Sequence, residues 1–584
     1  ETVLWRASDM LPGYNASAAS DTRQIITALR DQPNAQTGGS VTGRSFRADT
    51  ALTGRFPTLG GPAVAYLRGD RSRERQNLAQ NTIGGFRNRA DTVLGDIINA
   101  VPVFVGPADP LRYAGAWLDR RFPTATAPEN TAGARAYGGS NGFVATTAAR
   151  APLVYVGAND GMLHAFDAES GRERFAYVPN AVLGELAGPA GLTDPAYRHR
   201  AYVDGQVAVD PAFYDNAWHS VLVGGLRNGG RTIYALDVTD PPSNGRAEAR
   251  AASLVRWEFR DPQLGRTFGT PSIVRLHTGR WAAIFGNGYN SNAFGASLFI
   301  VDVETGELIR RLDTGAVPVT GQPGNGLASP TPIDVDGDRI VDYVYAGDLY
   351  GNVWRFDLTA RTAGAWTQSR LFQAGRDGQP QPITSAPAVA VHPLGPSYGV
   401  MVYVGTGQNI TPVTAERQAP ANSVYGLWDT QVFSYTGDGD VPPRPADTPI
   451  ARSALLTQQL QYAGTAGAAA LSFRSVSDRA INFVTRAATG VPQINDRGWV
   501  IDFDPATTEA VVRAPRVVDD TLEFESVVLN AESCQLTSSG FFTVVDRASG
   551  GVPARDIFDL NADGLVNEAD TIDGTRIVGI GYAS

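Results

Sequence analysis

The sequence predicts an all-β fold, a modified β-propeller of about seven blades, with a mixed, partly helical N-terminal lead-in. From about residue 150 onward, short alternating apolar runs are separated by Gly, Asn and Asp turns, which is typical of many short antiparallel strands. One strand-turn-strand pattern recurs, at a spacing of roughly 60 residues. The composition, 43% hydrophobic and 18% charged, is that of a globular protein able to bury a large core.

The change from helix-like stretches to short alternating apolar runs divides the chain into two expected parts. Residues 1–140 form the lead-in, and residues 141–584 form the propeller. The segment 124–150 between them is rich in Ala, Gly and Thr and has few large apolar residues, which indicates a loop or linker.

The lead-in carries patterns that favour helices. Residues 21–30 begin with an acidic N-cap candidate, and residues 64–80 form a second helix-like stretch that is interrupted by glycine. A further patch at 86–97 leads into an extended segment at 101–105. We therefore expect a mixed and mostly helical start.

The repeated pattern is clearest in two segments that align without gaps. Residues 154–167 and 344–357 share Val, Tyr, two Gly, Phe and Asp at equal positions, and the turn at 159–161 suits the positive φ angles of a hairpin. Looser copies and weaker candidates bring the count to about seven blades. The looser copies are 221–225 with 233–237, 283–286 with 298–302, and 402–405 with 424–428; the weaker candidates are 481–484 with 498–501, and 540–545. A pair of β-sandwiches is the alternative, but a fixed period favours the propeller.

Charge and cysteine content narrow the function classes. The net charge of −10 and the pI near 5.2 argue against nucleic-acid and anionic membrane partners and favour cations. The single cysteine, Cys534, excludes an intrachain disulfide and a thiolate metal cluster. The chain begins with Glu1 and has neither a leader nor an apolar run of about 18 residues. We expect a secreted protein with no membrane span, either mature or part of a longer chain.

The sharpest local signal is an acidic loop at 334–342. Its carboxylates stand at loop positions 1, 3, 5 and 9, so that a turning backbone brings them to one point, and a carbonyl at position 7 completes an oxygen-only shell suited to calcium. Without a cation these like charges would repel by about 1 to 4 kcal/mol per pair. A polar hairpin with solvated aspartates is the alternative. The expected ligands are Asp334, Asp336, Asp338, the carbonyl of Ile340, and Asp342.

A second candidate calcium loop lies at 559–570. It follows the pattern of an EF-hand loop, with Gly564 at the turn, but it ends in aspartate at position 12 and carries asparagine at two ligand positions. The lower charge and shorter side chain indicate a weaker site. The expected ligands are Asp559, Asn561, Asp563, the carbonyl of Leu565, Asn567 and Asp570.

No catalytic constellation is found in the sequence. The five histidines are scattered without a metal-binding spacing, and neither a nucleophile elbow nor a phosphate-binding loop occurs. We expect a protein that is not an enzyme.

Several strings, in the right order, make the chain resemble the PilY family of type IV pilus tip proteins, convincingly over about residues 65–360. They are 66–71, 94–97, 154–167, 175–179, 234–241 and the acidic loop followed by 343–348. The resemblance implies a modified seven-bladed propeller at the pilus tip on the bacterial cell surface, reached through the periplasm and outer membrane. It implies minor pilins as partners, contact with a host or abiotic surface, and roles in adhesion and twitching motility.

The same resemblance implies a regulatory role for the nine-residue loop. In the family this loop is the calcium site that controls pilus extension against retraction, and it maps onto residues 334–342. The family often carries an N-terminal von Willebrand A-like domain, whose metal motif is absent from this sequence, so adhesion assigned to that domain is not carried over.

Two other functions fit a calcium-binding propeller. A pyrroloquinoline-quinone dehydrogenase has similar blade hairpins, but many such enzymes use a vicinal cysteine pair, which a single cysteine cannot supply. A structural or glycan-binding propeller would use calcium only to brace its loops.

Overall fold

The computed structural model shows a mainly β chain in two compact units. The first unit comprises Glu1–Arg311 with Asp338–Ile340, and the second comprises Leu312–Gly337 with Val341–Ser584. The described residues are 3–11, 22–79, 84–131, 133–242, 246–315, 324–408, 421–466, 471–486, 490–528, 539–561 and 563–583. Cys534 lies outside them. None of the helices in these ranges is long and apolar enough to cross a membrane.

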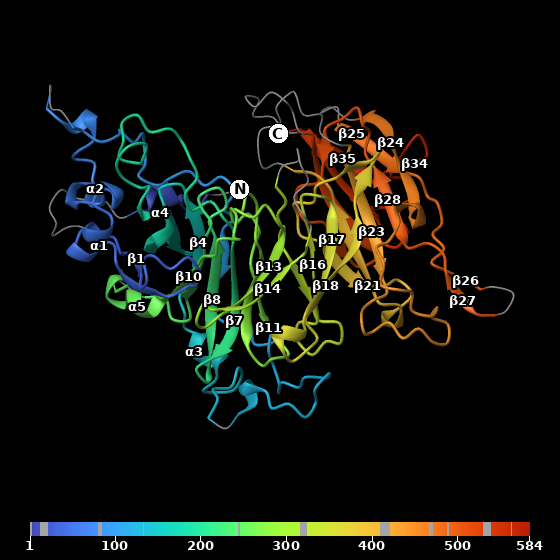
Figure 1. Ribbon diagram of the computed structural model, residues 1–584. Coiled ribbons are helices and arrows are strands. Elements are labelled where there is room, and N and C mark those ends of the chain that lie inside the picture. The colour runs from blue at the N-terminus through green and yellow to red at the C-terminus, as the bar shows by residue number, and fades with distance from the viewer. Residues whose placement is uncertain are drawn as a thin grey trace. The chain divides into compact units, whose positions relative to one another are not determined.

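The first unit begins with a six-stranded sheet in the order β2-β1-β6-β5-β4-β3. Two of its strands, β1 and β4, are labelled in Figure 1. Its neighbours pair antiparallel except β1 and β6, which run parallel. The bounds are β1 Ile25–Arg30, β2 Val41–Ser45, β3 Val103–Val105, β4 Leu153–Ala158, β5 Met162–Asp167 and β6 Glu173–Val178.

Two four-stranded sheets follow, in the orders β10-β9-β8-β7 and β11-β12-β13-β14. Such sheets of four sequential strands are the blades of a propeller. The bounds are β7 Val207–Tyr214, β8 Ala217–Gly225, β9 Ile233–Asp237, β10 Val255–Phe259, β11 Ser272–Arg275, β12 Trp281–Gly286, β13 Ser297–Asp302 and β14 Leu308–Asp313.

The second unit holds one more four-stranded sheet, β15-β16-β17-β18, and a larger sheet in the order β21-β22-β23-β28-β24-β25-β35-β32-β31-β29, in which β30 also pairs with β31. The C-terminal strands therefore join one continuous sheet. The bounds are β15 Thr331–Ile333, β16 Tyr343–Gly347, β17 Asn352–Asp357, β18 Thr367–Gln373, β21 Ala388–Val391, β22 Val400–Gly405, β23 Ser423–Asp429, β24 Leu456–Ala466, β25 Leu471–Val476, β28 Gly498–Asp502, β29 Glu509–Ala510, β30 Arg516–Val518, β31 Thr521–Val528, β32 Ser539–Asp546 and β35 Gly579–Ala583.

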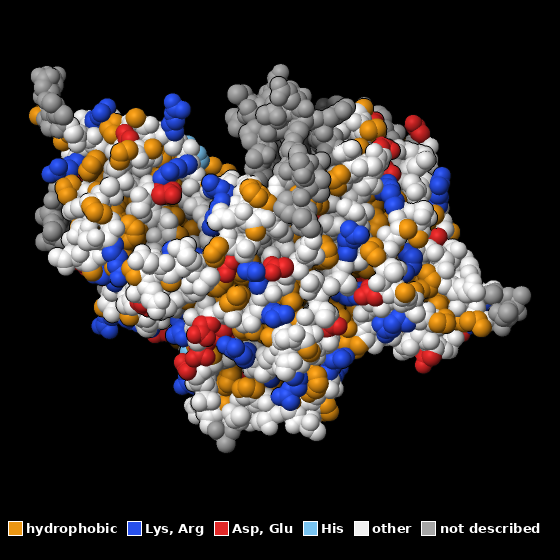
Figure 2. Space-filling view, in the orientation of Figure 1, with side chains coloured by type: hydrophobic (Ala, Val, Ile, Leu, Met, Phe, Trp, Pro, Cys, Tyr) orange, Lys and Arg blue, Asp and Glu red, His pale blue; other side chains and the backbone are white. Residues whose placement is uncertain are grey.

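Short elements complete the two units. Three small hairpins pair β19 Gly375–Arg376 with β20 Gln379–Pro380, β26 Val484–Arg486 with β27 Pro492–Ile494, and β33 Thr571–Ile572 with β34 Thr575–Arg576. The α-helices are α1 Thr50–Arg55, α2 Gly61–Leu67, α3 Phe143–Thr147, α4 Asn180–Leu183 and α5 Ala251–Leu254. On the surfaces visible in Figure 2, basic and acidic side chains are interspersed.

The repeated hairpins of the sequence are confirmed. The two best copies form β4–β5 and β16–β17, and the looser copies form β8–β9, β12–β13 and β22–β23. The segment 540–545 lies in β32, as expected for a strand.

One predicted hairpin is wrong. Residues 481–484 and 498–501 do not pair with each other, because β26 pairs with β27 while β28 lies between β23 and β24. Trp499, Val500 and Ile501 of β28 are all fully or almost fully buried, which suits a strand covered on both faces.

The lead-in contains less helix than the sequence indicated. Residues 25–30, predicted as helix, form the buried strand β1, because Ile25, Ile26 and Thr27 are β-branched and pack between two neighbouring strands. Of the predicted helix at 64–80, residues 64–67 belong to α2 and Arg75–Asn77 form one 3-10 turn, while residue 80 lies outside the described residues; 86–97 contains no helix. The extended segment predicted at 101–105 is confirmed in its second half, as β3.

The expected linker 124–150 is mostly irregular, with the short helix α3 near its end. Strands β1, β2 and β3 complete the sheet that β4–β6 begin, so this sheet includes residues on both sides of residue 140. The assignment of 1–140 and 141–584 as separate domains stays a prediction.

The glycine near the end of the first strand has a steric cause in the hairpins β4–β5, β8–β9, β16–β17 and β22–β23. A Cβ added at Gly157 would lie 2.3 Å from the carbonyl oxygen of Val203. At Gly225, Gly347 and Gly405 it would lie between 2.2 and 2.8 Å from a neighbouring segment. The repeated glycine therefore marks the place where another part of the chain packs directly against the hairpin.

The aspartate that ends the second strand of each hairpin is a turn former. Its Oδ1 accepts a hydrogen bond from a backbone N–H two or three residues further on, which turns the chain out of the sheet. This bond is made by Asp167 to Ser170, Asp237 to Thr239, Asp302 to Glu304, Asp357 to Thr359 and Asp429 to Gln431.

The close approach at Gly157 predicts that Gly157→Ala destabilises the first unit. Because the clash involves backbone, we expect the free energy of unfolding to fall by about 1–3 kcal/mol, measured by urea denaturation. Gly54→Ala in α1 is the control, since an added Cβ meets nothing within 4 Å there. Equal stability of the two variants would contradict the packing argument.

A buried charge network ties the N-terminal segment to the first sheet. Arg23 donates to both carboxylate oxygens of Glu173 at 2.7 Å, and His164 Nδ1 lies 2.8 Å from the same carboxylate. Burial lowers the pKa of His164, but the negative charges of Asp160 and Glu173 outweigh it and raise the pKa to about 9. The protonated histidine thus stabilises the fold fully below pH 6.5, and this contribution is lost as the pH rises through 9.

We expect the variant His164→Gln to lose this pH dependence. Between pH 6.5 and 9 the wild-type free energy of unfolding should fall by on the order of 1–3 kcal/mol more than that of the variant, measured by urea denaturation at several pH values. Parallel curves for the two proteins over that range would show that His164 is not charged in the folded state.

Candidate metal site

The loop 334–342 connects the paired strands β15 and β16. Two of its residues have left-handed backbone, Gly337 with φ of 77° and Arg339 with φ of 72°. These two residues turn the chain sharply, which brings side chains that are two residues apart to the same side of the loop.

Three predicted ligands converge in this loop. Asp334, Asp336 and Asp338 each place a carboxylate oxygen within 4.8 Å of the other two. Within the described ranges this is the one group of three or more acidic, histidine or cysteine side chains close enough to share a metal ion. All of its donors are oxygen, which is the chemistry that a hard divalent cation such as calcium prefers.

Backbone amides fix the orientation of the carboxylates. Asp334 Oδ1 accepts hydrogen bonds from the N–H groups of Asp336, at 3.2 Å, and Gly337, at 2.6 Å. Asp338 Oδ1 accepts one from the N–H of Ile340, at 2.8 Å. These bonds hold the carboxylates of Asp334 and Asp338 in fixed orientations within the loop.

The other two predicted ligands close the loop. Asp342 is fully buried, and its Oδ2 accepts a hydrogen bond from the N–H of Val335, at 2.7 Å. Ile340 is also fully buried, and its side chain belongs to an apolar core cluster of the first unit. Asp342 is outside the group of three, so its part in binding an ion stays a prediction.

The second loop, 559–570, has related geometry with a looser set of acids. Asp559 Oδ2 accepts a hydrogen bond from Gly564 N–H, and Asn561 Oδ1 accepts one from Asp563 N–H, both at 2.9 Å. Asn567 Oδ1 likewise accepts one from Ala569 N–H. Its carboxylates do not form a group of three within 4.8 Å among the described residues.

Asp570 organises this loop. It accepts hydrogen bonds from the backbone N–H groups of Asn567, Leu560 and Asn561, and these bonds, led by that of Asn567, lower the pKa of its carboxyl group. Leu565, whose carbonyl is a predicted ligand, has an exposed side chain.

The same two internal hydrogen bonds occur in each of the two loops. In each, the carboxylate at position 5 accepts from the N–H at position 7, in Asp338 to Ile340 and in Asp563 to Leu565. In each, the last aspartate accepts from the N–H at position 2. Both loops thus have the internal bonding of a turn that presents oxygen atoms inward.

Sequence reasoning missed how the first loop is anchored. Asp338 Oδ2 accepts a hydrogen bond from the N–H of Arg120, at 2.9 Å. The guanidinium of Arg339 donates to the carbonyls of Ala114, at 2.9 Å, and Ala116, at 3.3 Å. These partners lie more than 200 residues away in the sequence, and no local pattern could have indicated them.

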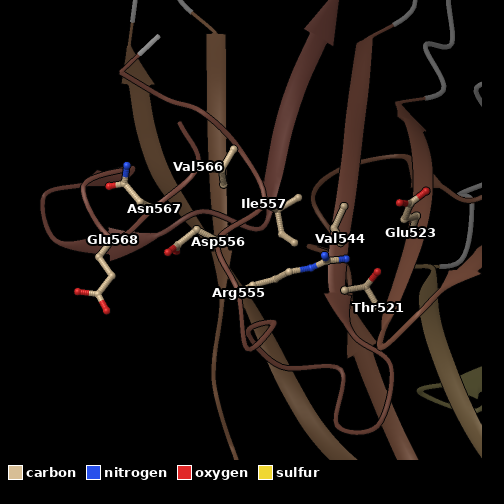
Figure 3. Close-up of a pocket in the computed structure, with 9 residues that line it drawn as sticks. All are labelled: Thr521, Glu523, Val544, Arg555, Asp556, Ile557, Val566, Asn567 and Glu568. Carbon is tan, nitrogen blue, oxygen red and sulfur yellow. The ribbon is translucent and has the colours of Figure 1, made fainter. Parts of the chain in front are cut away.

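A pocket of about 560 Å³ lies beside the second loop (Figure 3). Arg555 extends across it toward Val544, and residues 566–568 of the loop form one wall. Two of its acidic side chains already pair within the unit, Glu523 with Arg516 and Asp556 with Arg576, both at 2.7 Å. The pocket therefore offers a weaker case for a ligand than the acidic loop.

The histidines have structural environments. Four lie within hydrogen-bonding distance of carboxylates, and His392 is buried among aromatic rings, with its pKa lowered to about 3 by burial first and by Arg547. The four pairs are His164 with Asp160 and Glu173, His199 with Asp96, His219 with Asp237, and His277 with Asp119.

Comparison with known proteins identifies relatives over most of the chain. The model of a family described as the PilY1 beta-propeller domain matches residues 94–461. The type IV pilus biogenesis factor PilY1 of Pseudomonas aeruginosa strain PAK is 33% identical over 97% of this chain and 47% of its own length. A homologue of that factor from Xylella fastidiosa is 36% identical over 84% of this chain and 31% of its own length. The chain thus spans about half or less of these curated relatives.

A solved structure agrees with the sequence relatives. The crystal structure of the Pseudomonas aeruginosa PilY1 C-terminal domain shows 31% identity and a TM-score of 0.63, covering 82% of this chain and 93% of that one. Together with the blade-like sheets and the repeated hairpins, these matches show that the chain belongs to the PilY1 β-propeller family.

Proposed function

We propose that this chain is the propeller region of a type IV pilus biogenesis factor, and that a calcium ion bound by the loop 334–342 controls its action on the pilus. The convergence of Asp334, Asp336 and Asp338 carries the calcium part of the proposal. The relatives, which are named as type IV pilus biogenesis factors, carry the pilus part.

The energetics of the loop support a bound divalent ion. Carboxylates held this close repel each other by about 1 to 4 kcal/mol per pair at effective dielectric constants of water or protein surface. Asp338 is only 5% exposed, so water screens its charge poorly. When bound, calcium supplies positive charge and six to eight coordination positions for oxygen. Asp334, Asp336, Asp338 and Asp342 would hold it together with the carbonyl of Ile340.

The second loop supports a weaker site. Asp559, Asp563 and Asp570 would contribute carboxylates, while Asn561, Asn567 and the carbonyl of Leu565 would contribute neutral oxygens. Since calcium affinity follows the charge and the rigidity of the ligands, we place this loop below the first in affinity.

The family points to the setting of this control. The proposed partners are minor pilins at the pilus tip, and the proposed location is the bacterial cell surface, reached after secretion. Extension against retraction of the pilus, surface adhesion and twitching motility are the processes in which the ion would act. A non-enzymatic role agrees with the names of the relatives.

The first prediction concerns affinity. Asp336→Asn should weaken binding of calcium to the loop by about 10- to 100-fold, because it removes one of three converging charges. Isothermal titration of the whole chain measures this. Asp377→Asn is the control, since Asp377 has a side chain that is 90% exposed, lies outside both loops and has a left-handed backbone that asparagine accepts. Asp570→Asn should weaken only the lower-affinity step.

Equal calcium affinity of Asp336→Asn and Asp377→Asn would contradict the site.

The second prediction concerns the pilus. Asp342→Ala, introduced into the gene of the piliated bacterium, should lower calcium affinity and change the number of surface pili, counted by electron microscopy. The Asp377→Asn strain should match wild type. Normal piliation and motility in a strain whose protein has lost calcium binding would leave the ion a purely structural role.

A further inference from the structure

The tip of the acidic loop is held by a segment of the first unit that contributes no predicted ligand. Asp338, Arg339 and Ile340 all belong to this unit. Arg120 donates its backbone N–H to Asp338, and Ile340 packs in the core cluster that also contains Trp117. The loop tip and the segment 114–120 are therefore packed as one piece.

Arg339 makes the most specific of these contacts. Its guanidinium lies 4.8 Å from the centre of the Trp117 ring and donates to the carbonyls of Ala114 and Ala116. A planar guanidinium can stack on an aromatic ring while it donates in its own plane, which a lysine ammonium cannot reproduce.

Trp117 is a fixed support for this contact. It is 5% exposed, and its ring lies 5.3 Å from that of Tyr113 and 5.9 Å from that of Trp218. Arg275, which is paired with the buried Glu129, also lies over the Trp117 ring. Because these neighbours are buried, the ring cannot shift much, and Arg339 is held in turn.

The backbone of Arg339 also points to a role for its side chain. Its φ of 72° is a left-handed conformation that is unfavourable for an arginine and that glycine or asparagine adopts more easily. The contacts with Trp117 and the two carbonyls offset that cost. They also fix the peptide between the ligands Asp338 and Ile340.

From this geometry we infer that Arg339 is a positioning residue for the cation loop: by stacking on Trp117 it holds Asp338 and the carbonyl of Ile340 in the arrangement that binds the ion. This inference rests on the proposed calcium function. Binding is reciprocal, so the ion must in turn strengthen the contact between the loop tip and the segment 114–120.

The direction of the effect distinguishes positioning from simple electrostatics. Removal of a positive charge beside four carboxylates should, by charge alone, strengthen cation binding. Positioning predicts the opposite, that Arg339→Ala weakens it. Arg339→Lys keeps the charge and loses the planar fork, so charge alone predicts no change and positioning predicts a loss.

The experiment titrates the whole chain with calcium and follows binding by isothermal titration. We expect roughly tenfold weaker binding in Arg339→Ala and at least roughly threefold weaker binding in Arg339→Lys, in line with the value of a fixed, pre-organised ligand. Arg227→Ala is the matched control. Arg227 has a φ of 52° and lies 4.8 Å from the ring of Phe268, and its ion-pair partner is Asp204, outside the loop. The Arg227→Ala variant should bind calcium with the affinity of the wild-type chain.

A second readout tests the contact itself. Calcium should slow amide hydrogen exchange in the segment 114–120 of the wild-type chain, and this protection should be lost in Arg339→Ala but kept in Arg227→Ala. Calcium binding by Arg339→Ala that is as tight as or tighter than wild type would overturn the inference and leave the calcium site standing. Absence of calcium binding in the wild-type chain would instead overturn the proposed function.

Discussion

The mutual repulsion of three carboxylates, whose oxygens lie within 4.8 Å of one another, is the constraint around which the loop 334–342 is organised. Backbone N–H groups of the loop and of Arg120 hold these side chains and satisfy part of their acceptor capacity. Hydrogen bonds from neutral amides do not neutralise the charge. We propose that a divalent cation does. The repeated aspartates at the strand ends instead cap turns, and several also pair with a basic side chain, as Asp237 does with His219 and Asp429 with Arg355.

The propeller supplies a rigid base for this loop. Its repeated hairpins need glycine where a neighbouring segment approaches and aspartate where the second strand ends. The loop occurs in the same repeat, between the first two strands of the sheet β15-β16-β17-β18. Ile340 and Asp342 at the end of the loop are buried, whereas Asp334 at its start is exposed.

Much of the fold could be predicted from the sequence because its hairpins are local. In the two clearest copies, 154–167 and 344–357, both strands, the glycine and the turn aspartate lie within one short segment, so the pattern can be recognised without knowledge of long-range contacts. The order of strands in the large C-terminal sheet could not be predicted, because β28 pairs with β23 and β24 through long-range contacts. The prediction of a helix at the buried strand β1 is wrong for the same reason, since one of its partners, β6, lies far along the chain.

In the candidate site, too, the local features could be predicted and the long-range contacts could not. The spacing of Asp334, Asp336 and Asp338 could be predicted from a single loop, whereas the support by Arg120 and Trp117 depends on the folded chain. The most direct test is a crystal structure of the chain grown with calcium in excess. We expect a strong density peak bonded to oxygens of Asp334, Asp336 and Asp338 at about 2.3–2.6 Å. Well-ordered side chains that turn into solvent, with no ion between them, would contradict the central claim.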